Sequence, residues 1–296
     1  MDRQAYLELI KTAKIGDALP EGFVFRRFDL GFLKRETSTS TRNTVITSAG
    51  MPGVCCRIGP VNFEIYVGDT EPKISSGGPL RRILWQPITR TDRPAGWGRS
   101  WLDSRIKMTG FAEIAATGPY DLNWTEHAKR HAKRWRRERG SVWEMVTPSL
   151  DEFIVAYKKA KKDPTLKLLF VSQLKTAVQA HGSRVRLFGI RRAGTNRPIE
   201  AGFACIDVPE AASSLHLISF INQSLRKSPV GVGLMDEWFV TSKPLGIKFL
   251  DFGVFWAPGD PMAWQGFSQF KAQFDIHFIC YPLELARWEG WPWQKK

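Results

Sequence analysis

A basic, glycine-containing turn is the part of this sequence whose residue types and spacing are best suited to chemistry. It follows the apolar run LHLISFI (215–221) and precedes a segment with a helical pattern. Backbone N–H groups at a helix N-terminus, together with nearby cations, bind phosphate groups. The expected phosphate contacts are two cations and four residues at the start of the helix: Arg226, Lys227, Val230, Gly231, Val232 and Gly233. An ordinary surface loop that enters a helix is the alternative interpretation.

Two carboxylates in strand-like segments are candidates for moving a proton. Asp251 lies in the second apolar run, IKFLDFGVF (247–255), where aromatic neighbours would desolvate it. Glu200 begins an earlier run, IEAGFACID (199–207). A structural role for Asp251, capping a turn after its strand, is equally compatible with the sequence. The two apolar runs, 215–221 and 248–255, are expected to form the walls of a cleft.

A lysine and a row of arginines are the cations most suited to a substrate. Lys271 lies in the aromatic segment QGFSQFKAQF (265–274), where a buried cation is costly without an anion. Between residues 126 and 139 there are seven Lys/Arg and two Glu. The side chains expected to contact a substrate are Arg130, Arg134 and Arg137. Surface exposure of the lysine and a solvated helix face are the alternatives.

The overall composition limits the class of protein. The chain has 296 residues, is 43% hydrophobic and carries a formal net charge of +14. This balance indicates a globular protein with an anionic partner such as nucleic acid, a phosphorylated carrier or an anionic membrane surface. No apolar run is long enough to span a membrane, and the first residues do not form a secretory signal. We therefore expect a cytoplasmic protein, at most peripheral to the inner face of a membrane.

The cysteines and histidines do not predict a metal site. None of the four cysteines forms a C-x-x-C pair. His127 and His131 share a helix face but have no carboxylate partner in a metal-binding pattern. We therefore expect no metal cofactor.

Periodicity and turn residues predict a β-rich lobe over residues 1–120 and a second domain over 121–296. In the first, strands are expected at 45–50, 53–59, 61–68 and 81–88. In the second, helices are expected at 123–140, 149–162 and 165–181, followed by antiparallel strands at 183–192 and 198–208. The remaining order is strand (215–221), helix (231–243), strand (248–255), short helix (263–273) and strand (276–281). This order predicts an α/β sheet of mixed strand direction.

That order resembles the Gcn5-related N-acetyltransferase (GNAT) superfamily, and more closely its FemAB-like branch. The segments that carry the resemblance are IEAGFACID, GLMDEWFVTSKPLGIK before LDFGVF, and GFSQFKAQF. It covers roughly residues 120–282 and implies a mostly antiparallel sheet flanked by helices. Members often have a degenerate first lobe of the same fold, which residues 1–120 match poorly. The segment RKSPVGVG (226–233) only approximates the acyl-CoA signature of simple acetyltransferases.

The resemblance implies an acyltransferase that acts on an amine, with peptidoglycan precursors among the acceptors of this branch. It implies acyl-CoA or aminoacyl-tRNA as the donor, gripped by its phosphates. In this fold a backbone N–H of the strand before the basic turn polarises the acyl carbonyl, which indicates Phe220 and Ile221. Lys271 would face the acyl donor or a substrate phosphate.

A non-catalytic nucleic-acid-binding protein on a transferase-like scaffold is the rival hypothesis. It would use the basic helix and the tryptophans, and its binding would weaken steeply with salt. The basic helix also suits a tRNA acceptor stem, a pyrophosphate-linked lipid precursor or an acidic membrane face.

Overall fold

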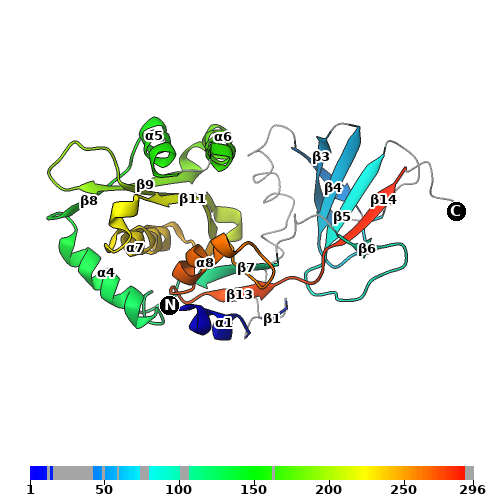
Figure 1. The fold of residues 1–296 in the computed structure, drawn as a ribbon, viewed down its shortest axis with the longest axis horizontal. Helices are drawn as coiled ribbons and strands as arrows, with labels where there is room; N and C mark the ends of the chain where they lie inside the picture. Colours follow the sequence, from blue (N-terminus) through cyan, green and yellow to red (C-terminus); the bar gives the residue numbers. More distant parts are fainter. Residues whose placement is uncertain are drawn as a thin grey trace. The chain divides into compact units, whose positions relative to one another are not determined.

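The computed structural model describes residues 1–11, 14–15, 43–48, 51–58, 60–73, 80–100, 107–161 and 164–290 (Figure 1). The chain divides into two compact units. The first comprises residues 1–6, 110–253 and 266–276, and the second comprises 7–109, 254–265 and 277–296. The chain therefore passes between the units several times, whereas the sequence analysis expected a single boundary at residue 120. Pairing of the last strand with the N-terminal strands accounts for part of this difference.

A mixed sheet forms the centre of the first unit. Six of its eight strands, in spatial order, are β7 (Met108–Glu113), β12 (Phe249–Val254), β11 (Ser213–Ile221), β10 (Ala201–Val208), β9 (Val185–Arg192) and β8 (Trp143–Val146). Strands β8 to β11 pair antiparallel, and β11 pairs parallel with β12. The expected order of elements from residue 123 is confirmed, with β8 as an additional edge strand. The structure is thus an α/β fold with a mostly antiparallel sheet flanked by helices.

Helices cover both faces of this sheet (Figure 1). α5 (Leu150–Ala160) and α6 (Pro164–His181) lie on one face, and α7 (Val230–Ser242) lies on the other. Phe153 of α5 packs edge-on against Phe220 of β11, with ring centroids 5.3 Å apart. On the opposite face, the rings of Phe203 in β10 and Trp238 in α7 are 4.7 Å apart. Because helices cover both faces, every residue of β10 is buried, and all of them except Asp207 are apolar.

The basic helix α4 (Glu126–Glu138) packs on the outer side of α7. It begins as the sequence predicts, because the Thr125 hydroxyl accepts the N–H of Ala128. Its buried residues are Ala128, Ala132 and Trp135, whose spacing forms one narrow stripe. The Trp135 ring lies where a Cβ at Gly233 of α7 would be, at 2.4 Å. Gly233 therefore permits close approach of the two helices.

A methyl group at Gly233 should separate α4 from α7. We expect Gly233→Ala to lower the free energy of unfolding by about 2 kcal/mol or more, because the rigid indole ring must move to admit it. Urea denaturation measures this loss. Gly266→Ala is the matched control, since no atom lies within 4 Å of the corresponding Cβ position. Equal stability of the two variants would contradict the packing role of Gly233.

The second unit contains a separate six-stranded sheet. Its spatial order is β2 (Asn43–Ser48), β3 (Met51–Ile58), β4 (Val61–Val67), β5 (Arg81–Gln86), β14 (Leu285–Glu289) and β6 (Gly98–Arg99). The four strands expected before residue 90 are confirmed. Strand β14, from the end of the chain, pairs antiparallel with β5 and was not predicted. Trp85 and Trp97 meet edge-on within its core, with centroids 5.2 Å apart.

The remaining elements are short. They are α1 (Arg3–Lys11), β1 (Lys14–Ile15), α8 (Gln265–Lys271) and β13 (His277–Cys280), and β1 pairs parallel with β13. Helix α1 was not expected. The short helix predicted at 263–273 is confirmed as a 3-10 turn, Met262–Trp264, followed by α8.

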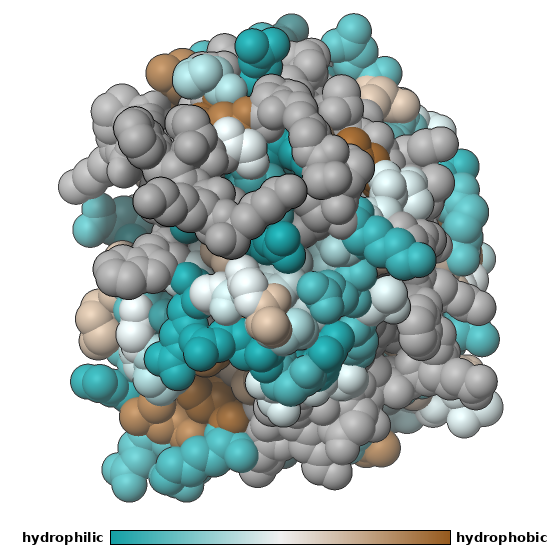
Figure 2. Space-filling model, turned by 90° about the vertical axis from the view of Figure 1, so that its right-hand side faces the viewer, coloured by the Kyte–Doolittle hydropathy of each residue, from teal (hydrophilic) through white to brown (hydrophobic). Residues whose placement is uncertain are grey.

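On the face drawn in Figure 2, hydrophilic residues predominate among those described, and apolar residues form small groups. Of the helices that the structure describes, none combines the length and hydropathy required of a membrane span.

Candidate active site

The feature that defines the candidate site is the end of the ladder between β11 and β12, beyond which the two strands no longer pair; this place is called the β11–β12 opening. The two strands pair over three positions, ending at Leu215 and Asp251, although β11 continues to Ile221. A β-bulge lies just beyond this point, because His216 is opposite Cys205 and Ile218 is opposite Ala204. Leu217 is therefore the extra residue of β11. A bulge bends its strand and interrupts the ladder, which is consistent with the separation of the two strands here.

Three polar groups meet at the end of the β11–β12 ladder. Lys271 of α8 donates a hydrogen bond from Nζ to the backbone carbonyl of Phe252, at 2.6 Å. Phe252 directly follows the last paired residue of β12. His216, on β11, also hydrogen-bonds the backbone of Phe252. Its imidazole stacks on the Phe203 ring at 5.0 Å, and its Nε2 is buried without a hydrogen-bond partner among the described residues. The site therefore joins a cation, a neutral base and a backbone carbonyl.

Burial determines the protonation of these groups. Desolvation lowers the pKa of Lys271 to about 8, although the Asp251 carboxylate opposes this shift. Desolvation also lowers the pKa of His216 well below its usual value, and the nearby cations Lys271 and Lys161 lower it further. At neutral pH His216 is therefore neutral, and Lys271 is a cation that releases its proton easily. By exposed area Lys271 is half-buried, neither fully in the interior nor on the open surface.

Asp251 has a local structural role in addition to its electrostatic effect on Lys271. Its side chain is 3% exposed, and its carboxylate accepts the N–H of Gly253 at 2.8 Å. Gly253 has φ of 71°, a backbone conformation that favours glycine. Asp251 therefore stabilises the turn after its strand and also acts electrostatically on Lys271.

Glu200 lies at the other end of β11. Its backbone carbonyl accepts the N–H of Asn222, which directly follows the strand, and its carboxylate is 3.9 Å from Arg192. Asp251 is opposite Leu215, so the two carboxylates are separated by about 20 Å at roughly 3.3 Å per strand residue. Of the three predicted catalytic residues, the structure brings together Asp251 and Lys271 but not Glu200.

The basic turn joins β11 to the N-terminus of α7 as expected. It contains one 3-10 turn, Gln223–Leu225, and Pro229 is the N-cap residue of α7 without a side-chain cap. Gly231 packs closely, because a Cβ there would be 2.9 Å from the Ile221 side chain. The N–H of Gly233 donates to the Pro229 carbonyl, which makes it less suited to a ligand than those of the preceding residues.

Cations gather near this turn. Arg226 and Lys227 are exposed, and neither side chain makes a hydrogen bond or ion pair with any residue that the structure describes. Lys161, at the C-terminal end of α5, was not predicted as part of the site. Burial and the nearby Arg226 guanidinium lower its pKa. A positive region therefore extends from the turn to His216, because the charge of Lys161 also lowers the pKa of His216.

The side chain of Phe220 belongs to the core between the sheet and α5, so only its backbone can contribute to the site. The predicted substrate contacts of α4 lie elsewhere, on the exposed side of that helix. Arg134 pairs with Glu138 at 2.7 Å, and Arg137 is 77% exposed. The described residues contain no cluster of three or more His, Cys, Asp or Glu suited to a metal ion.

Comparison with known proteins identifies the fold. Searches with the sequence find no matching family model and no matching curated protein. The structure is similar to FemX, at 10% identity over 97% of this chain and 96% of FemX, with a TM-score of 0.58. The fold is GNAT-like.

Two further solved structures support the GNAT-like fold over nearly the whole chain. A conserved protein of unknown function from Bacteroides thetaiotaomicron is 8% identical over 97% of both chains, with a TM-score of 0.55. L-PGS from Bacillus licheniformis is 11% identical over 95% of both chains, with a TM-score of 0.51. The resemblance expected from residues 120–282 is thereby confirmed as a GNAT-like fold.

Proposed function

We propose that this chain is an N-acyltransferase that moves an acyl or aminoacyl group from a phosphate-bearing carrier to an amine. The observation that carries the proposal is the β11–β12 opening. Its closed end is the last paired position of the ladder, and there Lys271 Nζ donates a hydrogen bond to the Phe252 carbonyl. An open strand edge exposes backbone donors to a ligand, and a lysine with lowered pKa can exchange a proton near neutral pH. The GNAT-like fold supports this assignment.

The basic turn and the start of α7 would bind the carrier's phosphates. The N–H groups of Val230, Gly231 and Val232 lie in the first turn of the helix, where the helix dipole favours an anion. Arg226 and Lys227 would supply charge, and Lys161 approaches from α5. Acyl-CoA and aminoacyl-tRNA both present phosphates and are the two candidate donors.

The acyl carbonyl would lie along the unpaired part of β11. Phe220 and Ile221 remain the predicted source of the polarising N–H. The bulged residue Leu217 is a second candidate, because it lies beside the closed end of the opening and has no partner in the ladder with β10. Such donors stabilise the negative oxygen of the tetrahedral intermediate.

Lys271 would transfer the proton. In its neutral form it accepts a proton from the acceptor amine as the amine nitrogen attacks the acyl carbon. The new C–N bond forms, the carbon–sulfur or carbon–oxygen bond to the carrier breaks, and the resulting ammonium returns the proton to the leaving sulfur or oxygen. Asp251 would tune Lys271 through its negative charge. Glu200, near the far end of β11 and 3.9 Å from Arg192, has no step in this mechanism.

Donor binding provides the test of the carrier site. Isothermal titration with acetyl-CoA and, separately, with a hydrolysis-resistant aminoacyl-tRNA would identify the donor. We expect the double variant Arg226→Ala, Lys227→Ala to weaken binding of that donor by at least about tenfold, because two charge-assisted contacts are lost.

The matched control removes two exposed lysines near the other end of α7, with Lys243→Ala and Lys248→Ala. These changes reduce the net charge equally, and we expect donor affinity to change little. Equal weakening by both double variants would indicate non-specific attraction. Failure of the wild type to bind either donor would reject the proposed function.

A further inference from the structure

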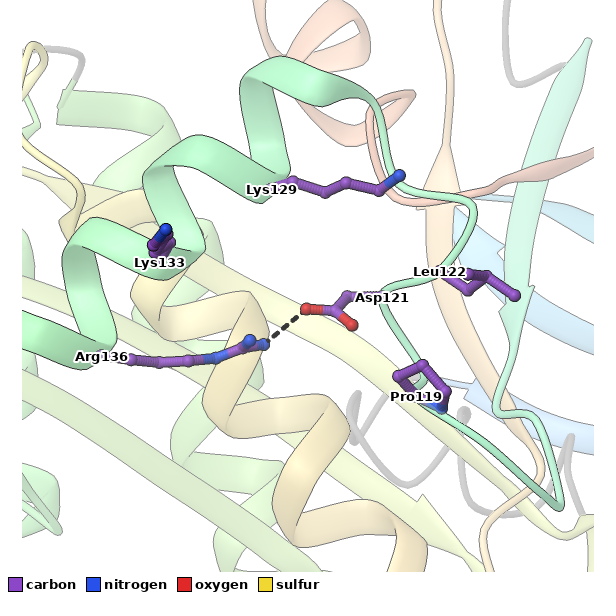
Figure 3. Close-up of a pocket in the computed structure, with 6 residues that line it drawn as sticks. All are labelled: Pro119, Asp121, Leu122, Lys129, Lys133 and Arg136. Carbon is purple, nitrogen blue, oxygen red and sulfur yellow. Dashed lines mark hydrogen bonds and ion pairs between the residues drawn. The ribbon is translucent and has the colours of Figure 1, made fainter.

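A second concave, positively charged site lies away from the β11–β12 opening. It is a cavity of about 370 Å³ between one side of α4 and the turn that precedes this helix (Figure 3). Its lining residues are Pro119, Asp121, Leu122, Lys129, Lys133 and Arg136. This volume falls in the range of small-molecule sites. All of these residues belong to the first unit.

Helix geometry brings the three cations of this cavity together. Lys129, Lys133 and Arg136 are separated by four and three residues, so they lie on one side of α4, and Figure 3 shows Lys129 and Arg136 extending toward the turn. The predicted substrate contacts Arg130, Arg134 and Arg137 do not line the cavity. The cavity therefore lies on the side of α4 next to the side on which the sequence predicted substrate contacts.

Arg136 forms a fixed wall of the cavity. Its guanidinium bonds Asp236 of α7 at 2.5 Å, Asp121 at 2.8 Å and the Tyr120 hydroxyl at 2.9 Å. The hydrogen bond to Asp236, which is 4% exposed, raises the pKa of Arg136. Because two carboxylates balance this cation, it shapes the cavity and holds the turn in place.

The two lysines are not balanced in the same way. The Lys133 side chain makes no hydrogen bond or ion pair with any residue within the described part of the chain. Lys129 pairs with Glu126 at 3.0 Å, but the Glu126 side chain is 89% exposed, so that pair is weak. The cavity therefore has positive charge available for an anion.

Apolar side chains form the opposite wall. Pro119 and Leu122 line the cavity from the turn, and Leu122 is 64% exposed. None of the described residues that line the cavity is aromatic, so they offer no platform for a stacked nucleobase. This combination suits a ligand with an anionic group and a short apolar portion.

We propose that this cavity binds a small organic phosphate. The phosphate contacts Lys129 and Lys133, and the organic portion covers Leu122 and Pro119. Lysine ammonium groups suit a phosphate dianion because each presents donors that can rotate toward its oxygens. Binding here does not require the acyl transfer reaction, so the two proposals stand or fall separately.

Titration with n-butyl phosphate and with inorganic phosphate tests the proposal. Isothermal calorimetry on the full chain at low salt should show saturable binding of n-butyl phosphate, tighter than that of inorganic phosphate. The double variant Lys129→Gln, Lys133→Gln should raise the Kd for n-butyl phosphate by about tenfold or more. Leu122→Ser should reduce the preference for n-butyl over inorganic phosphate.

The control variant Arg130→Gln, Arg137→Gln removes two charges from the same helix but none from the cavity. We expect its Kd to stay within about twofold of the wild type, since exposed charges outside the cavity act only at a distance. Circular dichroism shows whether each variant is folded. Equal weakening by both double variants, no binding to the wild type, or binding of a single-stranded oligonucleotide but not n-butyl phosphate would each overturn the proposal.

Discussion

Replacement of Lys271 by methionine is expected to lower the rate of acyl transfer by roughly 10²–10⁴-fold, the usual contribution of a positioned acid or base. Methionine keeps the length and apolar stem but cannot exchange a proton. Donor affinity should change little, because the basic turn supplies the phosphate contacts. A single-turnover assay with the donor identified by calorimetry separates the chemical step from binding.

The variant Lys271→Arg distinguishes proton transfer from electrostatic stabilisation. Arginine keeps the positive charge but does not lose its proton in proteins. We therefore expect Lys271→Arg to be as slow as Lys271→Met. Restoration of activity by arginine would show that charge alone suffices and would reject the general-base role.

The pH dependence follows from the lowered pKa of Lys271, about 8. The neutral form accepts the proton, so the transfer rate should rise with pH through about 8 and then level off. The Asp251 carboxylate raises this pKa, so Asp251→Asn should move the midpoint to lower pH. A midpoint that stays unchanged in Asp251→Asn would assign the titration to the acceptor amine instead.

A second large effect of Lys271 is expected on stability: at neutral pH its charge lowers the free energy of unfolding, although the same residue is needed for acyl transfer. Folding lowers the pKa of Lys271 from 10.5 to about 8. Between these values the unfolded chain retains a proton that the folded chain has released, so this residue makes the free energy of unfolding rise with pH. The full rise is about 3 kcal/mol, since one pKa unit corresponds to about 1.4 kcal/mol. Below pH 8 the buried ammonium destabilises the fold by that amount.

Lys271→Met removes this dependence. The stability of the variant relative to the wild type should be highest at pH 7 and should fall by about 3 kcal/mol as the pH rises past 10.5. At pH 7 the gain in stability of the variant is reduced by about 1 kcal/mol, because the hydrogen bond from Lys271 to Phe252 is lost. Urea denaturation at several pH values measures the difference. Lys243→Met, at an exposed position, is the control and should show no such trend.

Local sequence signals predicted most of the secondary structure. Thr125 and Ser149 cap α4 and α5 through hydrogen bonds that depend only on neighbouring residues. The turn 193–198 and the apolar runs on either side of it predicted β9 and β10. Strands β8 and β14 could not be recognised in this way, because pairing with a distant strand defines them. The predicted domain boundary at residue 120 could not anticipate this return of the chain.

The candidate site was predictable only where residue type carried the signal. The position of Lys271 among aromatic residues indicated a cation suited to a substrate, and in the structure it lies at the end of the β11–β12 ladder. His216 and the bulge at Leu217 were missed, because the register between strands determines both. Gly233 was expected to approach a phosphate, but its missing side chain is explained by Trp135, a residue about a hundred positions away in the chain.

The position of a bound donor tests the central claim most directly. A crystal structure of the chain with coenzyme A, or with a hydrolysis-resistant aminoacyl-RNA, should show phosphates at residues 226–232. The acyl end should lie between β11 and β12, within hydrogen-bond distance of Lys271. A donor bound elsewhere, with this opening closed or empty, would contradict the proposed active site.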